Sequence, residues 1–154
     1  MKPLRSLATA SLVVLLAGAS FAQSPMEAAI GARQDLMKLQ AYTMGQLFMM
    51  AQGKVPYDAK AAKTAADNLA AITAYDVTPL FPKGSDNASG AKTYALPAIW
   101  ENEPDFLAKY ADMHKAALAA AEVAGNGQDA LKGAMGALGG SCGACHKAYR
   151  APLQ

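Results

Sequence analysis

The chain has 154 residues, which is the length of a single domain, since domains typically run to about 100–150 residues. Its 14 lysines and arginines nearly balance its 12 aspartates and glutamates, and Lys2 and Arg5 account for the excess. Without these two residues the chain has 12 basic against 12 acidic groups. Such a neutral chain gives no support for nucleic acid or acidic lipid as a partner.

Residues 1–22 have the pattern of a cleaved secretory signal peptide. Two basic residues precede an apolar run from Leu7 to Leu16, and small residues follow up to Ser20-Phe21-Ala22. The alternative is a retained anchor, but the run is shorter than the roughly 20 residues that span a bilayer. We therefore expect export to the bacterial periplasm, a mature domain over residues 23–154 and no stable membrane insertion.

A first helix is predicted between Ser24 and Gly53. Ser24 can cap it, Pro25 suits the first helical position and Glu27 completes a capping box. Apolar residues spaced by threes and fours predict its inward stripe. These are Ile30, Met37, Ala41, Met44, Phe48 and Ala51.

A second helix is predicted from Asp58, its cap, to a point before Pro79. Its predicted inward residues are Ala62, Ala65, Leu69 and Ile72. Residues 79–101 are rich in proline, glycine and small polar residues, and this composition predicts a long crossover loop.

Two further helices are predicted on either side of a Gly125-Asn126-Gly127 turn. Asn102 can cap the third, which has Pro104 in its first turn. Its inward residues are Phe106, Tyr110, Met113, Ala117 and Ala121, and those of the fourth are Leu131, Met135, Leu138, Cys142, Cys145 and Tyr149. Two helical hairpins joined by one long loop predict an all-α fold, an antiparallel four-helix bundle.

The strongest chemical signal is Cys142-Gly143-Ala144-Cys145-His146, because Cys-x-x-Cys-His is a signature of c-type haem attachment. Residues three apart on a helix face the same way. Cys142 and Cys145 can therefore each form a thioether with one haem vinyl group, and His146 can bind the iron. We expect one covalently bound haem c.

A cysteine pair at this spacing has three other possible functions. A thioredoxin-like redox pair needs a βαβ context, and a structural zinc site needs four ligands, whereas the chain has only two cysteines and one other histidine, His114. A plain disulfide leaves the adjacent histidine unexplained. Haem attachment accounts for all three residues.

The sixth position of the iron is left open by these patterns. Met37 and Met44 both lie on the predicted inner stripe of the first helix, where methionine ordinarily fills the core. His114 is a further candidate, but its neighbours Asp112 and Lys115 favour a surface position. A vacant position is the remaining alternative.

At this point the chain resembles the cytochrome c′ family, in which the attachment motif lies at the C-terminal end of a four-helix bundle. The resemblance covers residues 24–152. It includes Gly53-Lys54-Val55-Pro56-Tyr57-Asp58, Pro79-Leu80-Phe81-Pro82, Ile99-Trp100 and Cys142 to Arg150.

The resemblance implies which residue faces the iron opposite His146. The family has a high-spin branch with five-coordinate iron and a low-spin branch in which methionine is the sixth ligand. In the family, the residue that faces the iron lies four positions after an arginine that is common in the first helix. In this chain Arg33-Gln34-Asp35-Leu36-Met37 puts a methionine at that position. The chain is most similar to the low-spin branch, with Met37 as ligand or, alternatively, only packed on the haem.

Further roles follow from the same resemblance. Arg33, with help from Gln34, is expected to meet a haem propionate, the alternative being a solvated arginine at the bundle edge. Arg150 is expected near the proximal face, the alternative being a solvated helix end. The family includes dimers packed through the first two helices, and Leu39 and Leu47 are expected to be exposed apolar residues that permit such a homodimer.

We therefore expect a one-electron carrier that serves redox partner proteins, and not an enzyme, with His146 and Met37 as axial ligands. A methionine sulfur on the iron favours the reduced state and suits electron transfer. The alternative is a five-coordinate cytochrome c′ that binds or sequesters nitric oxide or other small gases. Peroxidase activity is a weaker alternative, because the first helix offers no distal histidine.

Overall fold

The computed structural model describes residues 24–153, and the predicted signal peptide lies outside them. This part of the chain is helical, and its only β-type pairing is an isolated bridge between Ala95 and Arg150. The elements are α1 (Pro25–Ala51), α2 (Ala59–Thr73), the 3₁₀ turn η1 (Thr78–Leu80), α3 (Ala98–Glu101), α4 (Glu103–Val123) and α5 (Gln128–Tyr149).

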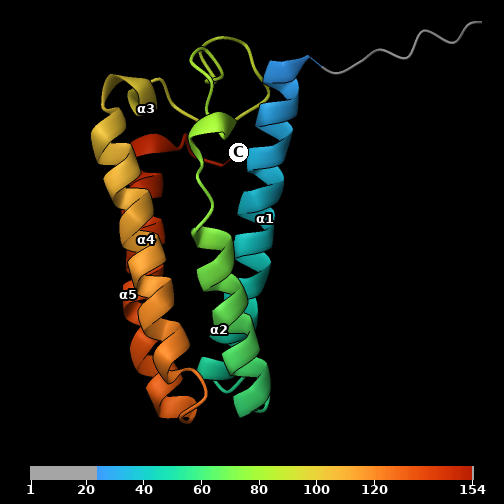
Figure 1. Ribbon diagram of the computed structural model, residues 1–154, viewed down its shortest axis with the longest axis vertical. Helices are drawn as coiled ribbons and strands as arrows, with labels where there is room; N and C mark the ends of the chain where they lie inside the picture. Colours follow the sequence, from blue (N-terminus) through green and yellow to red (C-terminus); the bar gives the residue numbers. More distant parts are fainter. Residues whose placement is uncertain (1–23, 154) are drawn as a thin grey trace, which may run out of the picture.

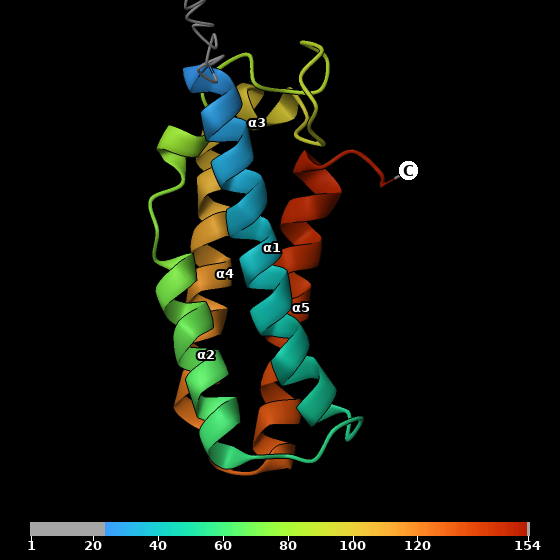
Figure 2. The ribbon, with the colours of Figure 1, turned by 90° about the vertical axis from the view of Figure 1, so that its right-hand side faces the viewer.

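The four long helices form an antiparallel bundle, which confirms the predicted fold class (Figure 1). Short turns join α1 to α2 and α4 to α5, so each pair is a helical hairpin. The connection from α2 to α4 is long and carries the chain across one end of the bundle (Figures 1 and 2). Within residues 24–153 no helix is long and apolar enough to cross a membrane.

The helix starts largely follow their local sequence. Ser24 and Glu27 make the predicted capping box, and the Asp58 side chain accepts a hydrogen bond from the Ala61 N–H at 2.7 Å. Asn102 lies at the predicted N-cap position of α4, but its side chain makes no capping hydrogen bond. Asn102 instead closes α3, donating its backbone N–H to Ala98 O at 3.0 Å.

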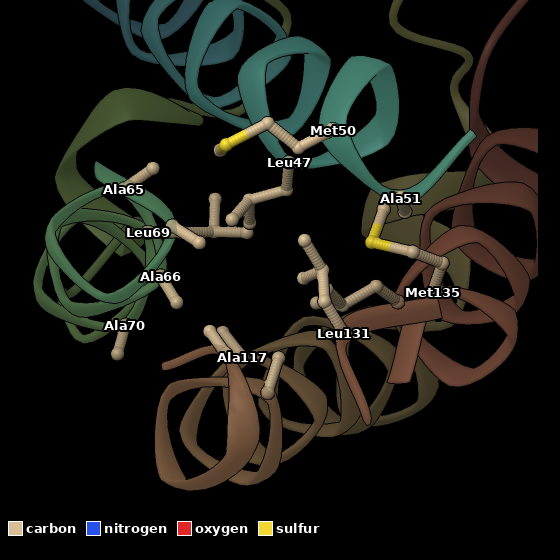
Figure 3. Close-up of a cluster of buried hydrophobic side chains, with 14 residues drawn as sticks. Leu47, Met50, Ala51, Ala65, Ala66, Leu69, Ala70, Ala117, Leu131 and Met135 are labelled. Carbon is tan, nitrogen blue, oxygen red and sulfur yellow. The ribbon is translucent and has the colours of Figure 1, made fainter. Parts of the chain in front are cut away.

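The half of the bundle that contains α2 has a continuous apolar core (Figure 3). Alanines on α2 and α4 let the helices approach closely, and larger side chains from α1 and α5 fill the centre. Its largest fully buried members are Leu47, Leu69, Leu131 and Leu138. The inward positions predicted for α2 are buried except Ile72, which is half-buried.

The stripe predicted for α1 differs from the observed core. Of its six residues only Ile30 and Ala51 are buried, while α1 contributes Leu47 and Met50 to the core. The expected exposure of Leu47 was therefore wrong, whereas Leu39 is 49% exposed as predicted. The physical reason is that α1 faces two environments along its length: the core beside α2, and a cavity in the other half of the bundle.

The crossover, residues 74–97, makes that second half different. An irregular loop was predicted over residues 79–101, whereas the structure begins the crossover earlier, places η1 inside it and makes residues 98–101 the short helix α3. Because α2 has 15 residues against 27 in α1, the crossover occupies the space beside the first half of α1 (Figure 1). The Trp100 indole N–H, from α3, donates to Phe81 O at 2.9 Å and fastens the two ends of the crossover together.

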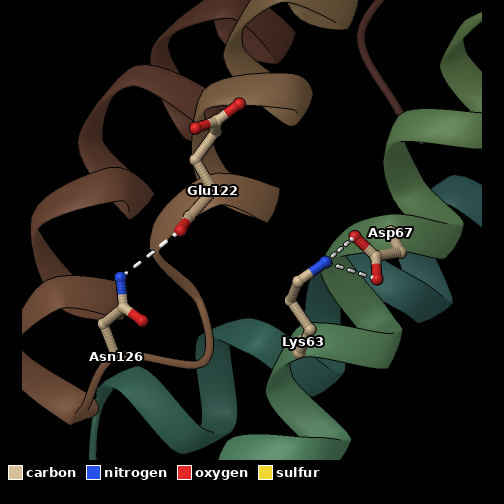
Figure 4. A network of polar contacts seen from close by, with 4 residues as sticks. All are labelled: Lys63, Asp67, Glu122 and Asn126. Carbon is tan, nitrogen blue, oxygen red and sulfur yellow. Dashed lines mark hydrogen bonds and ion pairs between the residues drawn. The ribbon is translucent and has the colours of Figure 1, made fainter.

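The opposite end of the bundle carries ordinary surface contacts (Figure 4). Lys63 and Asp67 form an ion pair one turn apart on α2 at 2.6 Å, and Asn126 donates to Glu122 O at 3.4 Å beside the α4–α5 turn. Both members of the ion pair are about half exposed, and such pairs contribute little to stability. This end therefore depends on the buried core for its stability.

Candidate functional site

A cavity of about 790 Å³ lies in the half of the bundle that the crossover covers. Its walls come mainly from α1, α4, α5 and the crossover, with Leu69 from α2 and Ile99 from α3, and they are mostly apolar and aromatic. This volume is in the range of sites that hold organic cofactors. The charged side chains that line it, Arg33, Lys38, Lys109 and Arg150, are all basic, which suits a ligand with carboxylates.

Cys142 and Cys145 lie together on one wall of the cavity, near the C-terminal end of α5. Both are half-buried, and they are not joined in a disulfide. Burial raises the pKa of both thiols, whereas a thioredoxin-like pair works through a lowered thiol pKa. Among residues 24–153 no cluster of three or more histidine, cysteine or carboxylate side chains could hold a metal ion such as structural zinc.

His146 lines the same cavity and is half-buried. Burial, followed by the positive charge of Arg150, lowers the pKa of its imidazole below the ordinary 6.5. The ring is therefore neutral at pH 7 and keeps a lone pair for a metal ion. Arg150 is exposed at the helix end but lines the cavity, so it acts on His146 through its charge.

The residues of the predicted α1 stripe that are absent from the core line this cavity. Met37, Ala41, Met44 and Phe48 all belong to its wall, on a different helix from the cysteines. The structure thus brings Met37, Met44 and His146 to one cavity. The period of the stripe was predicted correctly, but its middle part marks a cofactor-sized space and not a helix contact.

His114 is placed elsewhere. It lies half-buried on α4, where its Nδ1 is 3.1 Å from the Thr73 hydroxyl at the end of α2, and it is not among the cavity residues. The structure therefore does not bring His114 together with the cysteine pair.

Arg33 is buried, with 3% of its surface exposed, so the alternative of a solvated arginine was wrong. Its guanidinium donates to Leu80 O at 3.3 Å, Ser85 Oγ at 2.7 Å and Thr93 Oγ1 at 2.8 Å, and also to Ser85 O. Burial lowers its pKa, and the charge of Asp86 acts in the opposite direction. Gln34, half-buried beside it, donates to Lys92 O at 2.8 Å.

Two groups of cavity residues were not identified as functional from the sequence. The crossover contributes Phe81, Thr93, Tyr94 and Ala95, for which its irregular pattern gave no signal. The second group comes from α4 and was predicted only as core. In that group the Tyr110 hydroxyl accepts a hydrogen bond from Gln40 of α1 at 3.0 Å, and Gln40 is buried. This glutamine beside the apolar stripe of α1 was the sequence signal that could have pointed to Tyr110.

The end of α5 is fastened to the crossover. Leu96 N–H donates to Tyr149 O at 3.0 Å, and Ala151 N–H donates to Tyr94 O at 2.8 Å. The Tyr149 hydroxyl donates to the Asp105 carboxylate on α4, which lowers the pKa of Asp105. Burial, together with this carboxylate, raises the pKa of Tyr149 from 10 to about 12.

Replacing Tyr149 by phenylalanine should change the alkaline limb of the stability profile. The folded pKa lies above the ordinary value, so the neutral phenol contributes stability that is fully present below pH 10 and is lost as the pH rises through about 12. At pH 7 Tyr149→Phe should lower the free energy of unfolding by about 1 kcal/mol through the lost hydrogen bond. Between pH 10 and 12 the difference from the wild type should shrink.

Guanidinium denaturation of both proteins at a series of pH values would measure this difference. Tyr75→Phe is the matched control, because Tyr75 is 52% exposed and its loss should leave the profile unchanged. A difference between Tyr149→Phe and the wild type that stays constant from pH 7 to 12 would contradict the expectation.

Comparison with known proteins gives consistent matches. A family model described as Cytochrome C′ matches residues 28–150. Cytochrome c-554 from Cereibacter sphaeroides is 43% identical over 151 residues, which cover 97% of this chain and 98% of that protein.

Solved structures agree with these matches. A cytochrome c′ from a Rhodobacter species aligns with a TM-score of 0.81 at 37% identity, covering 83% of this chain and 98% of the other. A second cytochrome c′, described as having a ligand-controlled dimer dissociation, aligns with a TM-score of 0.75 at 30% identity, covering 85% and 99% of the two chains.

Proposed function

Because the chain belongs to the cytochrome c′ family, whose members are haem electron carriers or gas-binding proteins, we propose that it is a periplasmic one-electron carrier with His146 and Met37 as axial ligands. Proteins of this family hold one covalent haem c, which confirms the expected cofactor. The observation that carries the proposal is that Met37, from α1, lines the same cavity as His146 and the two cysteines of α5.

The residues of this cavity fit haem c. Cys142 and Cys145 share a wall at the spacing that two thioethers require, and the neutral imidazole of His146 follows directly on the same helix turn. When bound, the haem iron supplies a one-electron Fe(III)/Fe(II) couple. The apolar walls limit the entry of water, and a Met37 sulfur ligand would stabilise the reduced state.

Arg33 and Gln34 are proposed to lie near the haem propionates. The terminal N–H groups of Arg33 are engaged by the crossover, so its Nε–H is the donor that remains for a propionate. Gln34 keeps its amide oxygen and one amide N–H. Toward a propionate, which accepts hydrogen bonds and does not donate them, Arg33 and Gln34 therefore each offer one N–H.

The alternative function is gas binding at a five-coordinate iron. It is favoured by the typical state of the family, which is high-spin with histidine as the axial protein ligand. In that case Met37 would pack on the haem face and leave the sixth position open to nitric oxide or carbon monoxide.

Visible spectra of the oxidised and reduced holoprotein at neutral pH decide between these functions. We expect low-spin spectra in both states and a methionine-to-iron charge-transfer band near the red edge of the visible range. The ferrous protein should bind carbon monoxide slowly, because Met37 must first leave the iron. A high-spin ferric spectrum without that band, or prompt carbon monoxide binding, would refute the axial ligation by Met37 and favour the gas binder.

Localisation and assembly complete the proposal. Homologous cytochromes c′ are periplasmic, and structures of this family include dimers. On α1, Leu39 and Tyr42 are 49% and 66% exposed, and they offer apolar area for a homodimer through α1 and α2. The redox partners are proposed to be proteins that reach the cavity side of the bundle.

A further inference from the structure

Arg33 connects α1 to the crossover through its four terminal N–H groups. One terminal nitrogen donates to Leu80 O and Ser85 Oγ, and the other donates to Ser85 O and Thr93 Oγ1. These acceptors lie 47 to 60 residues further along the chain. A single side chain thus holds both ends of the segment 80–93 against the first half of α1.

The same segment forms part of the cavity wall. Phe81 and Thr93 line the cavity, as do Tyr94 and Ala95 directly after them. The Phe81 ring lies over the guanidinium, with its centroid 4.9 Å from the Arg33 Cζ, which is a cation–π distance. A displacement of this segment would therefore open the cavity on the side where α1 places Met37.

The burial of Arg33 explains why the segment should stay in place. A buried charge is tolerated only when hydrogen-bond acceptors replace its water, and the crossover supplies all four of the bonds described above. Ser85 is fully buried at the centre of this arrangement, and Gly84 before it has φ of +85°, a backbone conformation that favours glycine. Moving the segment outward would break the four hydrogen bonds that the guanidinium makes to it.

We infer that Arg33 is a positioning residue that clamps the segment 80–95 onto α1 and thereby restricts the access of small molecules to the Met37 side of the haem cavity. We call Arg33 with Leu80, Ser85 and Thr93 the Arg33 clamp. The inference rests on the haem cavity of the proposed function but does not require Met37 to bind the iron. It also differs from a propionate contact, because the clamp acts through the position of the crossover.

The sharpest test is the double variant Ser85→Ala/Thr93→Val of the holoprotein. It removes two hydroxyl acceptors while the charge of Arg33 stays. At low carbon monoxide concentration, where the uptake rate depends on access as well as on the departure of Met37, we expect the ferrous protein to take up carbon monoxide about tenfold faster or more, because lost hydrogen bonds to a charged group weaken the closed state by at least that factor. Backbone amides of residues 80–95 should exchange hydrogen faster, while those of α5 before Cys142 should not change.

Two further variants distinguish the hydrogen-bonding geometry of Arg33 from the effect of charge. Arg33→Lys keeps the charge but loses the planar fork, so it should also speed carbon monoxide uptake. Lys83→Met removes a charge from an exposed position of the same crossover and should leave both measurements at the wild-type value.

The clamp is refuted if the double variant matches the wild type in both carbon monoxide uptake and hydrogen exchange. It is also refuted if Arg33→Gln shifts the reduction potential while exchange in residues 80–95 stays unchanged, since that result describes a propionate contact. Prompt carbon monoxide uptake by the wild type would refute ligation of the iron by Met37 but would not refute the Arg33 clamp. The uptake rates of variant and wild type could then still be compared as a measure of access.

Discussion

Met37→Ala is expected to convert the iron from a low-spin to a high-spin state and to remove the methionine charge-transfer band. Alanine has no donor atom, so His146 would be left as the axial protein ligand. Carbon monoxide uptake by the ferrous protein should rise by about a hundredfold, which corresponds to a barrier lower by about 2.7 kcal/mol. The reduction potential should fall, because the thioether sulfur that favours Fe(II) is gone.

The matched control is Met44→Ala. Met44 lies on the same helix two turns later and lines the same cavity, so its removal creates comparable space without touching the proposed ligand. It should leave the spectra low-spin. Unchanged low-spin spectra in Met37→Ala would show that another residue binds the iron, and loss of the band in Met44→Ala would identify that residue.

Cys142→Ala/Cys145→Ala should abolish covalent haem attachment. Both sulfurs stand on the cavity wall at the thioether spacing, and the described chain has no third cysteine that could replace them. A haem-stained denaturing gel should show no signal at the position of the protein. In this variant a pyridine haemochrome spectrum should detect haem before extraction with acidified organic solvent but not after it, because haem without thioether bonds is extracted.

The double cysteine variant should also be less stable. A cofactor that binds only the folded state stabilises it, and a haem free to dissociate does so only in proportion to its concentration. The midpoint of thermal unfolding should therefore depend on added haem in the variant and not in the wild type. Ser141→Ala, next to Cys142, is the control and should keep its stained band; retained haem in the double variant would contradict the attachment site.

Much of the fold could be predicted because local signals determine it. Ser24 with Glu27, Asp58 and Gly127 mark helix boundaries that the structure retains, since caps and glycines act within one turn. The buried positions of α2 and α5 follow a helical period. Asn102 shows the limit of such signals, because it stands at the predicted N-cap of α4 without a side-chain capping bond, and its backbone N–H closes the short helix α3.

The α1 stripe shows a second limit. Periodicity finds the apolar side of a helix but not what faces it, so the stripe alone left Met37 and Met44 open between core filling and iron ligation, and Phe48 was expected only in the core, whereas all three line the cavity. Leu47 was expected on the surface for the same reason and is fully buried. A helix that packs against a neighbouring helix and a helix that packs against a cofactor need the same spacing of apolar residues, so the pattern does not distinguish the two.

The candidate site was predicted in part. The spacing of Cys142, Cys145 and His146 identified one wall, because thioether attachment is local in sequence. The partners of Arg33 could not be predicted, since they lie in a crossover with no periodicity and meet α1 only in the folded chain. Long-range contacts of loops are set by the whole fold, and no short pattern encodes them.

The shortness of α2 has a further consequence for how the protein tolerates sequence change. One half of the bundle is held by four helices and an alanine-rich core, and the other by three helices and a crossover around the cavity. Substitutions in the two halves that lie more than about 7–10 Å apart and share no contact partners should have additive effects on unfolding. The crossover can therefore vary in sequence, and with it the accessibility of the iron, while the core that keeps the chain folded stays the same.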